Sequence, residues 1–329
     1  MMFRRRRVAG AALPERGINV PPSMRPWRNP AIVNPDSWWD PEQGPAFIAH
    51  EMPLLQELGP ATVRVEFPWW AIERDRKGHA DWSRADRIVE AAAAHLVQLA
   101  PVLVWTPAWA APGCVNMPTS CVTSALAATC PATPPSAEDF GDFVHAIVSR
   151  YGGRVHCWEM WNEPDLPKYF NGSAADYARR VLVPGYRGAK AAAPDCLVIF
   201  GGPHVPDVGW IRAVLDAGGE GHFDVMAFHG YGDARAVLRG ASSVAPLAGG
   251  KPLWLGEWGV QDRRGVKQVR LIEAVLGTAS ELHQAQWYAL RDDRAMSGRG
   301  EVCVESWWGL VTATYRRKPS FAVFQAWPD

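Results

Sequence analysis

Short apolar runs and amphipathic runs alternate along most of the chain. The apolar runs are rich in β-branched and aromatic residues, which predicts buried strands at residues 16–20, 61–67, 97–105, 155–161, 196–202, 223–229, 252–257 and 285–290. The runs between them repeat apolar residues at helical spacing. This spacing predicts helices at residues 46–58, 81–96, 137–152, 174–193, 209–218, 268–283 and 319–326, with a weaker pattern over 233–244.

Strands that alternate with helices predict parallel pairing through right-handed crossovers. A count of eight favours a closed (β/α)8 barrel, the TIM barrel, over an open doubly wound sheet. The glycine-rich dinucleotide fingerprint that would support the open sheet does not follow the first predicted strand. A length of 329 residues fits one such barrel. We therefore expect a single α/β domain over residues 16–329 after a disordered basic tail over residues 1–15.

Three predicted connections are too long to be simple turns: residues 21–42, 106–135 and 291–317. They follow the first, third and eighth predicted strands, so they would lie on the C-terminal face, where barrels build their active sites. Aromatic faces over a cleft suit sugars, because the C–H groups of a sugar pack on π-surfaces. The three connections contain Trp27, Trp38, Trp39, Trp109, Trp307 and Trp308.

Charge and hydropathy limit the classes of partner. Lys and Arg together number 34, as do Asp and Glu, so the formal net charge is zero, which argues against nucleic acid as the main partner. No apolar run reaches 18 residues, so no membrane-spanning helix is expected. The basic N-terminus is followed by an apolar patch too short for a secretory signal, and secretion and a cytoplasmic location both stay open. We expect a monomer.

The six cysteines contain no C-x-x-C pair, and no histidines stand at ligand spacing, so neither a metal nor a cofactor is predicted. Cys157 and Cys196 lie in strand-like runs and are predicted to be buried small hydrophobes. A disulfide in the connection after the third strand would indicate an oxidising compartment. The pairing stays open among Cys114, Cys121, Cys130 and Cys303.

Two glutamates stand at predicted strand ends. Glu163 follows the fourth strand in VHCWEMWNEPD, and Glu257 ends the seventh in KPLWLGEWGV. Both would project over the same mouth of a barrel. Two carboxylates across one site can cleave a glycosidic bond, and a separation of about 5 to 5.5 Å makes the reaction retaining. The N-E-P triplet alone would be ordinary turn sequence.

The W-N-E-P segment, together with E-W-G at the seventh strand, resembles the retaining β-glycosidases of glycoside hydrolase clan A. The resemblance covers the chain from about Arg16 to the C-terminus. WNEPDLPKYF, the Tyr-bearing helix that follows it and the later FGGP are most similar to family 39, with family 5 second.

This resemblance implies roles for single residues. Glu163 would be the general acid/base and Glu257 the nucleophile. Asn162 would hydrogen-bond the sugar's 2-hydroxyl, Tyr231 would hold the nucleophile's carboxylate, and Arg64 would lower its pKa. His229 would line the site, and Trp287 would be the aromatic platform under the sugar. Further substrate contacts are expected from Trp105, Trp109 and Trp258.

Several alternatives stay open at this point. Arg64 could instead pair with Glu66 on the same strand face, and Glu159 and Glu66 are expected to satisfy Arg64 or each other. Asp165 is expected to cap a helix or loop. The same two glutamates could serve a transglycosidase, or the barrel could bind glycan without catalysis. The sugar, the linkage, and exo versus endo action are not specified.

Overall fold

The computed structural model describes residues 31–34, 36–59, 62–111, 132–278, 281–292 and 307–326. Within these residues, eight parallel strands form one sheet in the order β5-β4-β3-β2-β1-β8-β7-β6. The strands are β1 (Ala31–Asn34), β2 (Thr62–Pro68), β3 (Gln98–Val104), β4 (Cys157–Met160), β5 (Leu197–Phe200), β6 (Met226–His229), β7 (Leu253–Trp258) and β8 (Gln284–Tyr288).

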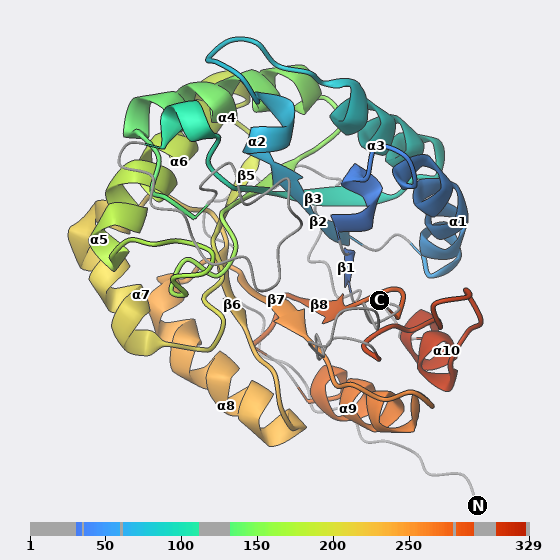
Figure 1. Ribbon diagram of the computed structural model, residues 1–329. Helices are drawn as coiled ribbons and strands as arrows, with labels where there is room; N and C mark the ends of the chain where they lie inside the picture. The colour runs from blue at the N-terminus through green and yellow to red at the C-terminus, as the bar shows by residue number, and fades with distance from the viewer. Residues whose placement is uncertain are drawn as a thin grey trace, which may run out of the picture.

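The two ends of this strand order also contact each other. Ile199 of β5 forms a parallel bridge with Val225, which directly precedes β6, and the backbone N–H of Phe200 donates to the Val225 carbonyl at 2.9 Å. Figure 1 shows the strands gathered at the centre with the helices around them. The architecture is an α/β barrel.

The first strand lies at a different place from the one predicted. Residues 16–20 are outside the described residues, and the strand that pairs with both β2 and β8 is β1. The prediction that residues 21–42 form one long connection is therefore wrong. The run Ala-Ile-Val is very short and stands between Pro30 and Pro35, so its pattern looked like loop sequence.

The helices predicted from amphipathic spacing are present among the described residues. In the run 174–193, α5 and α6 are joined by the π-helical turn Ala178–Leu182 without a break. The helices are α1 (Gly44–Glu57), α2 (Trp69–Ile72), α3 (Ser83–Ala94), α4 (Ala137–Tyr151), α5 (Ala174–Tyr177), α6 (Val183–Ala192), α7 (Val208–Val214), α8 (Ala234–Val244), α9 (Val266–Leu276) and α10 (Pro319–Gln325).

Strand side chains face two different apolar regions. Alternate residues point outward and pack under the helices, while the others point into the barrel. The interior holds a small apolar cluster of Ala100, Cys157, Ile199, Val225, Ala227 and Trp254. Two residues further along β4 and β6, the inward positions change to Glu159 and His229, so the interior becomes polar toward the carboxyl ends of the strands. Cys157 and Cys196 are buried free thiols, which confirms that prediction.

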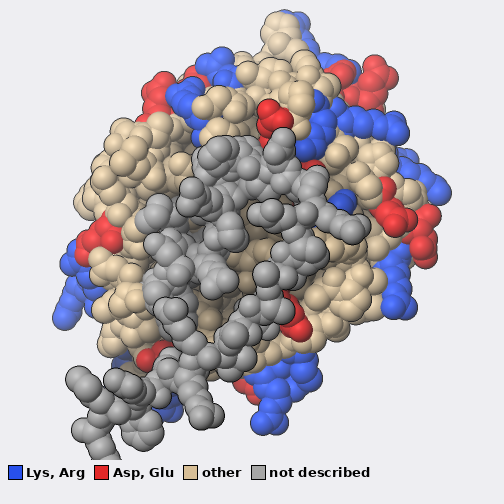
Figure 2. Space-filling model, turned by 180° about the vertical axis from the view of Figure 1, so that it is seen from behind, with Lys and Arg blue, Asp and Glu red and all other residues tan. Residues whose placement is uncertain are grey.

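The described surface carries both signs of charge. On the face in Figure 2, Lys and Arg side chains are interspersed with Asp and Glu around the rim. Among the described helices, none combines the length and apolar character needed to cross a bilayer.

Candidate active site

Glu163 is placed by an unusual backbone after β4. Trp161 and Glu163 both adopt positive φ angles, 83° and 42°, a region that side-chain-bearing residues rarely occupy. The Trp161 indole N–H donates to the Tyr169 carbonyl at 3.0 Å, and the Glu163 backbone N–H donates to the Gly202 carbonyl at 3.2 Å. Such strained conformations cluster at functional sites. These contacts hold Glu163 at the carboxyl end of β4.

Glu257 is placed by a bulge in β7. Phe228 of β6 lies opposite Leu255, but the next residue, His229, lies opposite Glu257, so Gly256 is an extra residue. Trp254 faces the barrel interior and Leu255 the outer core, so plain alternation would point Glu257 outward. The bulge instead turns Glu257 into the barrel. Register within the sheet is not visible in the sequence, where the glycine is the only signal of the bulge.

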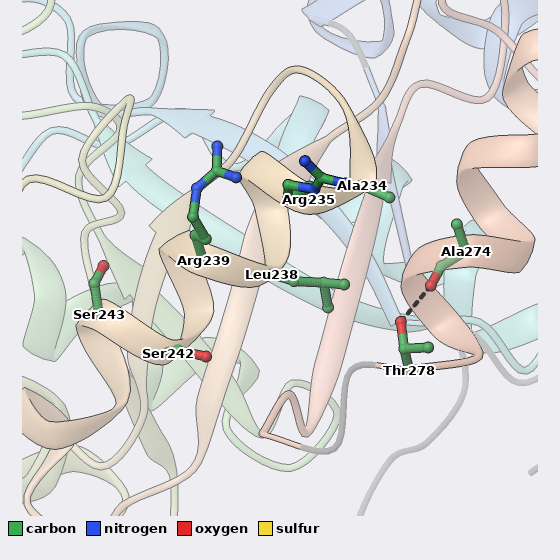
Figure 3. Close-up of a pocket in the computed structure, with 8 residues that line it drawn as sticks. All are labelled: Ala234, Arg235, Leu238, Arg239, Ser242, Ser243, Ala274 and Thr278. Atoms are coloured by element: carbon green, nitrogen blue, oxygen red, sulfur yellow. Dashed lines mark hydrogen bonds between the residues drawn. The ribbon is translucent and has the colours of Figure 1, made fainter.

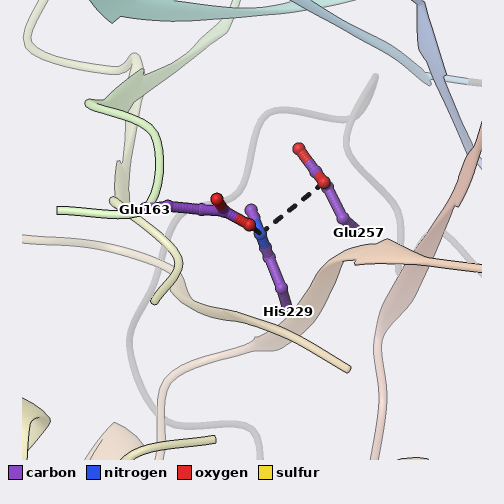
Figure 4. A group of neighbouring side chains, drawn as sticks. All are labelled: Glu163, His229 and Glu257. Carbon is purple, nitrogen blue, oxygen red and sulfur yellow. Dashed lines mark hydrogen bonds and ion pairs between the residues drawn. The ribbon is translucent and has the colours of Figure 1, made fainter. Parts of the chain in front are cut away.

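Glu163, His229 and Glu257 meet over the interior of the barrel (Figure 4). One carboxylate oxygen from each glutamate and one imidazole nitrogen all lie within 4.8 Å of one another. His229 Nδ1 is 3.0 Å from Glu163 Oε1 and 3.7 Å from Glu257 Oε2. These three groups could together coordinate a metal ion, but Nδ1 and Glu163 are already hydrogen-bonded to each other.

Two glycines enclose the His229 ring. A Cβ atom added to Gly202 would lie 2.9 Å from His229 Nε2, and one added to Gly256 would lie 3.3 Å from it. Burial alone would lower the pKa of His229, but the charge of Glu257 and the hydrogen bond with Glu163 raise it above its ordinary value. The ring is therefore fixed between the two carboxylates as their shared neighbour.

The Glu257 carboxylate is surrounded by groups that favour its charged form. Arg64 Nη1 donates to Oε1 and the Tyr231 hydroxyl donates to Oε2, each at 2.6 Å. Burial would raise the pKa of Glu257, but the positive charges of His229 and Arg64 and these hydrogen bonds lower it below its ordinary value. Glu257 is thus set to be ionised at neutral pH.

Arg64 is fully buried on β2 and binds three side chains. Its Nε and Nη2 donate to the two carboxylate oxygens of Glu159 at 2.6 and 2.9 Å, and Nη2 also donates to Asn162 Oδ1 at 2.9 Å. The expectation that Glu159 satisfies Arg64 is confirmed. Glu66, the other predicted partner, accepts a hydrogen bond from the Trp105 indole at 2.7 Å.

Two tryptophans predicted to contact substrate face away from the interior. Trp258 and Trp287 are both fully buried, and their rings meet edge to face at 4.9 Å. The Trp287 indole N–H donates to the Trp308 carbonyl at 3.1 Å. Each follows an inward residue, Glu257 or Gln286, so strand alternation points both rings to the outer core. Trp287 therefore cannot serve as a platform under the sugar, and the inward aromatic residue of β8 is Tyr288.

Tyr288 belongs to a group of three aromatic side chains near Glu257, to which Tyr231 is hydrogen-bonded. The Tyr231 and Trp308 ring centroids are 5.2 Å apart, Tyr288 and Trp308 are 5.9 Å apart, and Tyr231 and Tyr288 are 6.5 Å apart. All three are half-buried. We call Tyr231, Tyr288 and Trp308 the aromatic wall. The resemblance to family 39 placed the platform at Trp287, one residue before Tyr288, and a shift of one residue exchanges the outward ring for the inward one.

Of the other tryptophans considered in the sequence, Trp105 remains near the mouth of the barrel, whereas the other described ones are tied into the core or the loops. Trp105 is half-buried at the end of β3, and its ring lies 5.3 Å from that of Tyr169. Trp109 packs edge-on against Trp69 and donates its indole N–H to the Glu73 carbonyl, which ties it to the segment after α2. Trp38 and Trp39 are buried in the core, and Trp27 lies outside the described residues.

A separate groove of about 940 Å³ opens on the helical layer between α8 and α9 (Figure 3). None of its lining residues belongs to the group around the two glutamates. It is lined by Ala234, Arg235, Leu238, Arg239, Ser242, Ser243, Ala274 and Thr278.

One family model matches part of the chain. Residues 135–292 match the family model described as the glycosyl hydrolase catalytic core. The matched residues include Glu163 and Glu257, which agrees with the glycoside hydrolase predicted from the sequence. No curated protein matches the chain.

Solved structures of glycoside hydrolases share the fold. A family 39 glycoside hydrolase from the gut symbiont Bacteroides cellulosilyticus WH2 has a TM-score of 0.68 at 19% identity, over 91% of this chain and 64% of that one. A family 39 β-xylosidase from Caulobacter crescentus has a TM-score of 0.68 at 18% identity, over 90% of this chain and 70% of that one. An exo-β-1,4-mannosidase from Opitutaceae bacterium strain TAV5 has a TM-score of 0.67 at 18% identity, over 90% of this chain and 58% of that one. The chain thus spans somewhat less than two thirds of the Bacteroides protein.

Proposed function

We propose that this chain is a retaining β-glycosidase that hydrolyses β-linked oligo- or polysaccharides by double displacement. The observation that carries the proposal is the approach of the Glu163 and Glu257 oxygens to within 4.8 Å of each other. Retaining enzymes hold their two carboxyl groups about 5 to 5.5 Å apart, whereas inverting enzymes leave about 6.5 to 9.5 Å for an intervening water. The short separation supports direct attack on the sugar.

In the first step, a Glu257 oxygen attacks the anomeric carbon while the bond from that carbon to the leaving oxygen breaks. Glu163 gives its proton to the leaving oxygen. The lowered pKa of Glu257 supports its role as the ionised nucleophile. In the second step, Glu163 takes a proton from water as the water attacks the same carbon and releases Glu257.

The remaining groups would hold the sugar between the two carboxylates. Asn162, fixed through its Oδ1 by Arg64, is the expected partner of the sugar's 2-hydroxyl. The aromatic wall would pack against the sugar's apolar face, with Tyr288 in the place that sequence analysis gave to Trp287. Trp105 would contribute from the opposite side of the mouth.

We extend the proposal to the whole chain as a monomeric (β/α)8 barrel over residues 16–329, closed through the contact between β5 and β6. The β-xylosidase from Caulobacter and the exo-β-1,4-mannosidase from Opitutaceae direct the first choice of substrates. β-Xylosides and β-mannosides should be assayed before other sugars.

Replacing the nucleophile tests the mechanism. In Glu257→Ala, hydrolysis of 4-nitrophenyl β-glycosides should be lost, and added azide should restore turnover with an inverted glycosyl azide as product. Glu273→Ala, on the exposed face of α9, is the matched control and should keep full activity. Full activity of Glu257→Ala would refute the assignment. An excess of sugar acceptor would show whether the covalent intermediate is passed to another sugar in place of water.

A further inference from the structure

Asp165 and His204 form a pair next to Glu163 that the two chemical steps do not use. The Asp165 side chain is only 5% exposed, whereas the His204 ring is 40% exposed. Asp165 Oδ1 accepts a hydrogen bond from the His204 backbone N–H at 2.9 Å, and its Oδ2 contacts His204 Nδ1. Asp165 thus acts as a loop cap, as predicted, but it also binds the ring.

The pair lies on the acid/base side of the mouth. Asp165 is two residues after Glu163, and His204 is two residues after Gly202, whose carbonyl accepts from the Glu163 backbone N–H. Both residues belong to connections that follow β4 and β5. Glu257 and Tyr288 belong to β7 and β8, and Tyr231 and Trp308 lie in the connections that follow β6 and β8. Since Glu163 would protonate the leaving oxygen, the departing sugar must lie on the side of Glu163.

The contact with the ring does more than join two loops. The backbone hydrogen bond of His204 to Asp165 would join them whatever side chain residue 204 carried. The second contact fixes the direction of the imidazole, because Nδ1 faces the carboxylate and Nε2 is left on the exposed part of the ring. No hydrogen bond from a described residue occupies Nε2. Val205, the next residue in the sequence, is 42% exposed and adds an apolar surface to this connection.

We propose that His204, oriented by Asp165, forms a binding subsite for the leaving-group sugar. Nε2 hydrogen-bonds a hydroxyl of that sugar, which can act as donor or acceptor, and Val205 contacts its C–H groups. This inference rests on the proposed glycosidase function and adds which residues recognise the departing part of the substrate. Substrates with a sugar leaving group would gain from the contact, whereas a planar nitrophenolate offers no such hydroxyl.

The test compares two substrates of the same glycone, the 4-nitrophenyl β-glycoside and the β-1,4-linked disaccharide, for both xylose and mannose. In His204→Ala, the ratio of kcat/KM for the disaccharide to kcat/KM for the aryl glycoside should fall by about tenfold, the effect of losing one hydrogen bond in a partly desolvated site. Asp165→Asn should lower the ratio in the same direction, because the amide oxygen keeps the backbone contact but the NH2 group cannot accept a hydrogen bond from Nδ1–H. His145→Ala, an exposed histidine on α4, should leave the ratio unchanged.

Two results would overturn the subsite. An equal fall with both substrates would mean that the pair only positions the Glu163 loop, and an unchanged ratio would place the ring outside the substrate's path. Thermal melting of each variant shows whether it is folded, so that a lower rate is not mistaken for unfolding. If the wild type cleaves none of these substrates, xylose and mannose are excluded as the glycone of the proposed glycosidase. The subsite is then tested alone by titrating the His204 imidazole proton resonances with xylobiose and mannobiose, where no shift with either would reject it.

Discussion

Replacing Trp287 by alanine tests whether strand alternation decides which aromatic ring of β8 meets the substrate. Its ring is fully buried in the outer core, where it meets the Trp258 ring edge to face. Removing a buried Trp side chain costs about 3–5 kcal/mol in the free energy of unfolding. An unfolding entropy of about 2.1 cal/mol/K per residue gives roughly 0.7 kcal/mol/K for this chain, so the melting temperature should fall by about 4–7 °C.

Tyr288→Ala should behave in the opposite way. This side chain is half-buried on the inward face, so its loss should change the melting temperature by only about 1–2 °C. We expect kcat/KM on aryl β-glycosides to fall by at least about tenfold, equivalent to about 1.4 kcal/mol of lost transition-state binding.

Calorimetric melting and initial rates at 25 °C separate the two effects. Trp287→Phe serves as a control, because it keeps an aromatic ring in the core and should melt between the wild type and Trp287→Ala. The reasoning is refuted if Trp287→Ala melts within about 1 °C of the wild type yet binds substrate poorly. That result would put the Trp287 ring under the sugar.

Two further predictions concern the neighbours of the carboxylates. In Tyr231→Phe, Glu257 loses a hydrogen bond that helps to hold its pKa below the ordinary value, so the pKa should rise. The acidic limb of the kcat/KM profile should then move to higher pH. An unmoved limb, or the same displacement in the control Tyr186→Phe, would contradict this. In Gly202→Ala, the new Cβ would lie 2.9 Å from the His229 ring and displace the ring from Glu163, so kcat/KM should fall. The control Gly153→Ala has open space around its new Cβ and should leave kcat/KM unchanged.

The sequence predicted seven of the eight strands and the helices, because their periodic patterns are long enough to rise above loop composition. β1 was missed because four residues between prolines carry too little pattern. The two glutamates could be predicted because Glu257 ends a strand-like run and Glu163 stands two residues after another. Their projection over one mouth was predicted as well, but the bulge that turns Glu257 inward was not, because an extra residue relative to β6 is visible only in the sheet register.

The direction of the aromatic side chains was out of reach for the same reason. Trp287 and Tyr288 are adjacent in sequence, and a shift of one residue exchanges the outward ring for the inward one. Pairing of β8 with β7 and β1 decides between them. The His204–Asp165 pair was missed because its members are 39 residues apart and meet only where two loops lie side by side.

Arg64 contacts two carboxylates, and under the proposed mechanism this has a consequence for the covalent intermediate. If Glu257 becomes an ester of the sugar, it gives up its negative charge while Arg64 stays buried. A buried guanidinium without a counter-ion would be costly. Glu159, which keeps both of its hydrogen bonds to Arg64 at 2.6 and 2.9 Å, is that permanent counter-ion. In the proposed double displacement, one arginine could therefore serve a carboxylate whose charge disappears and returns with every turnover.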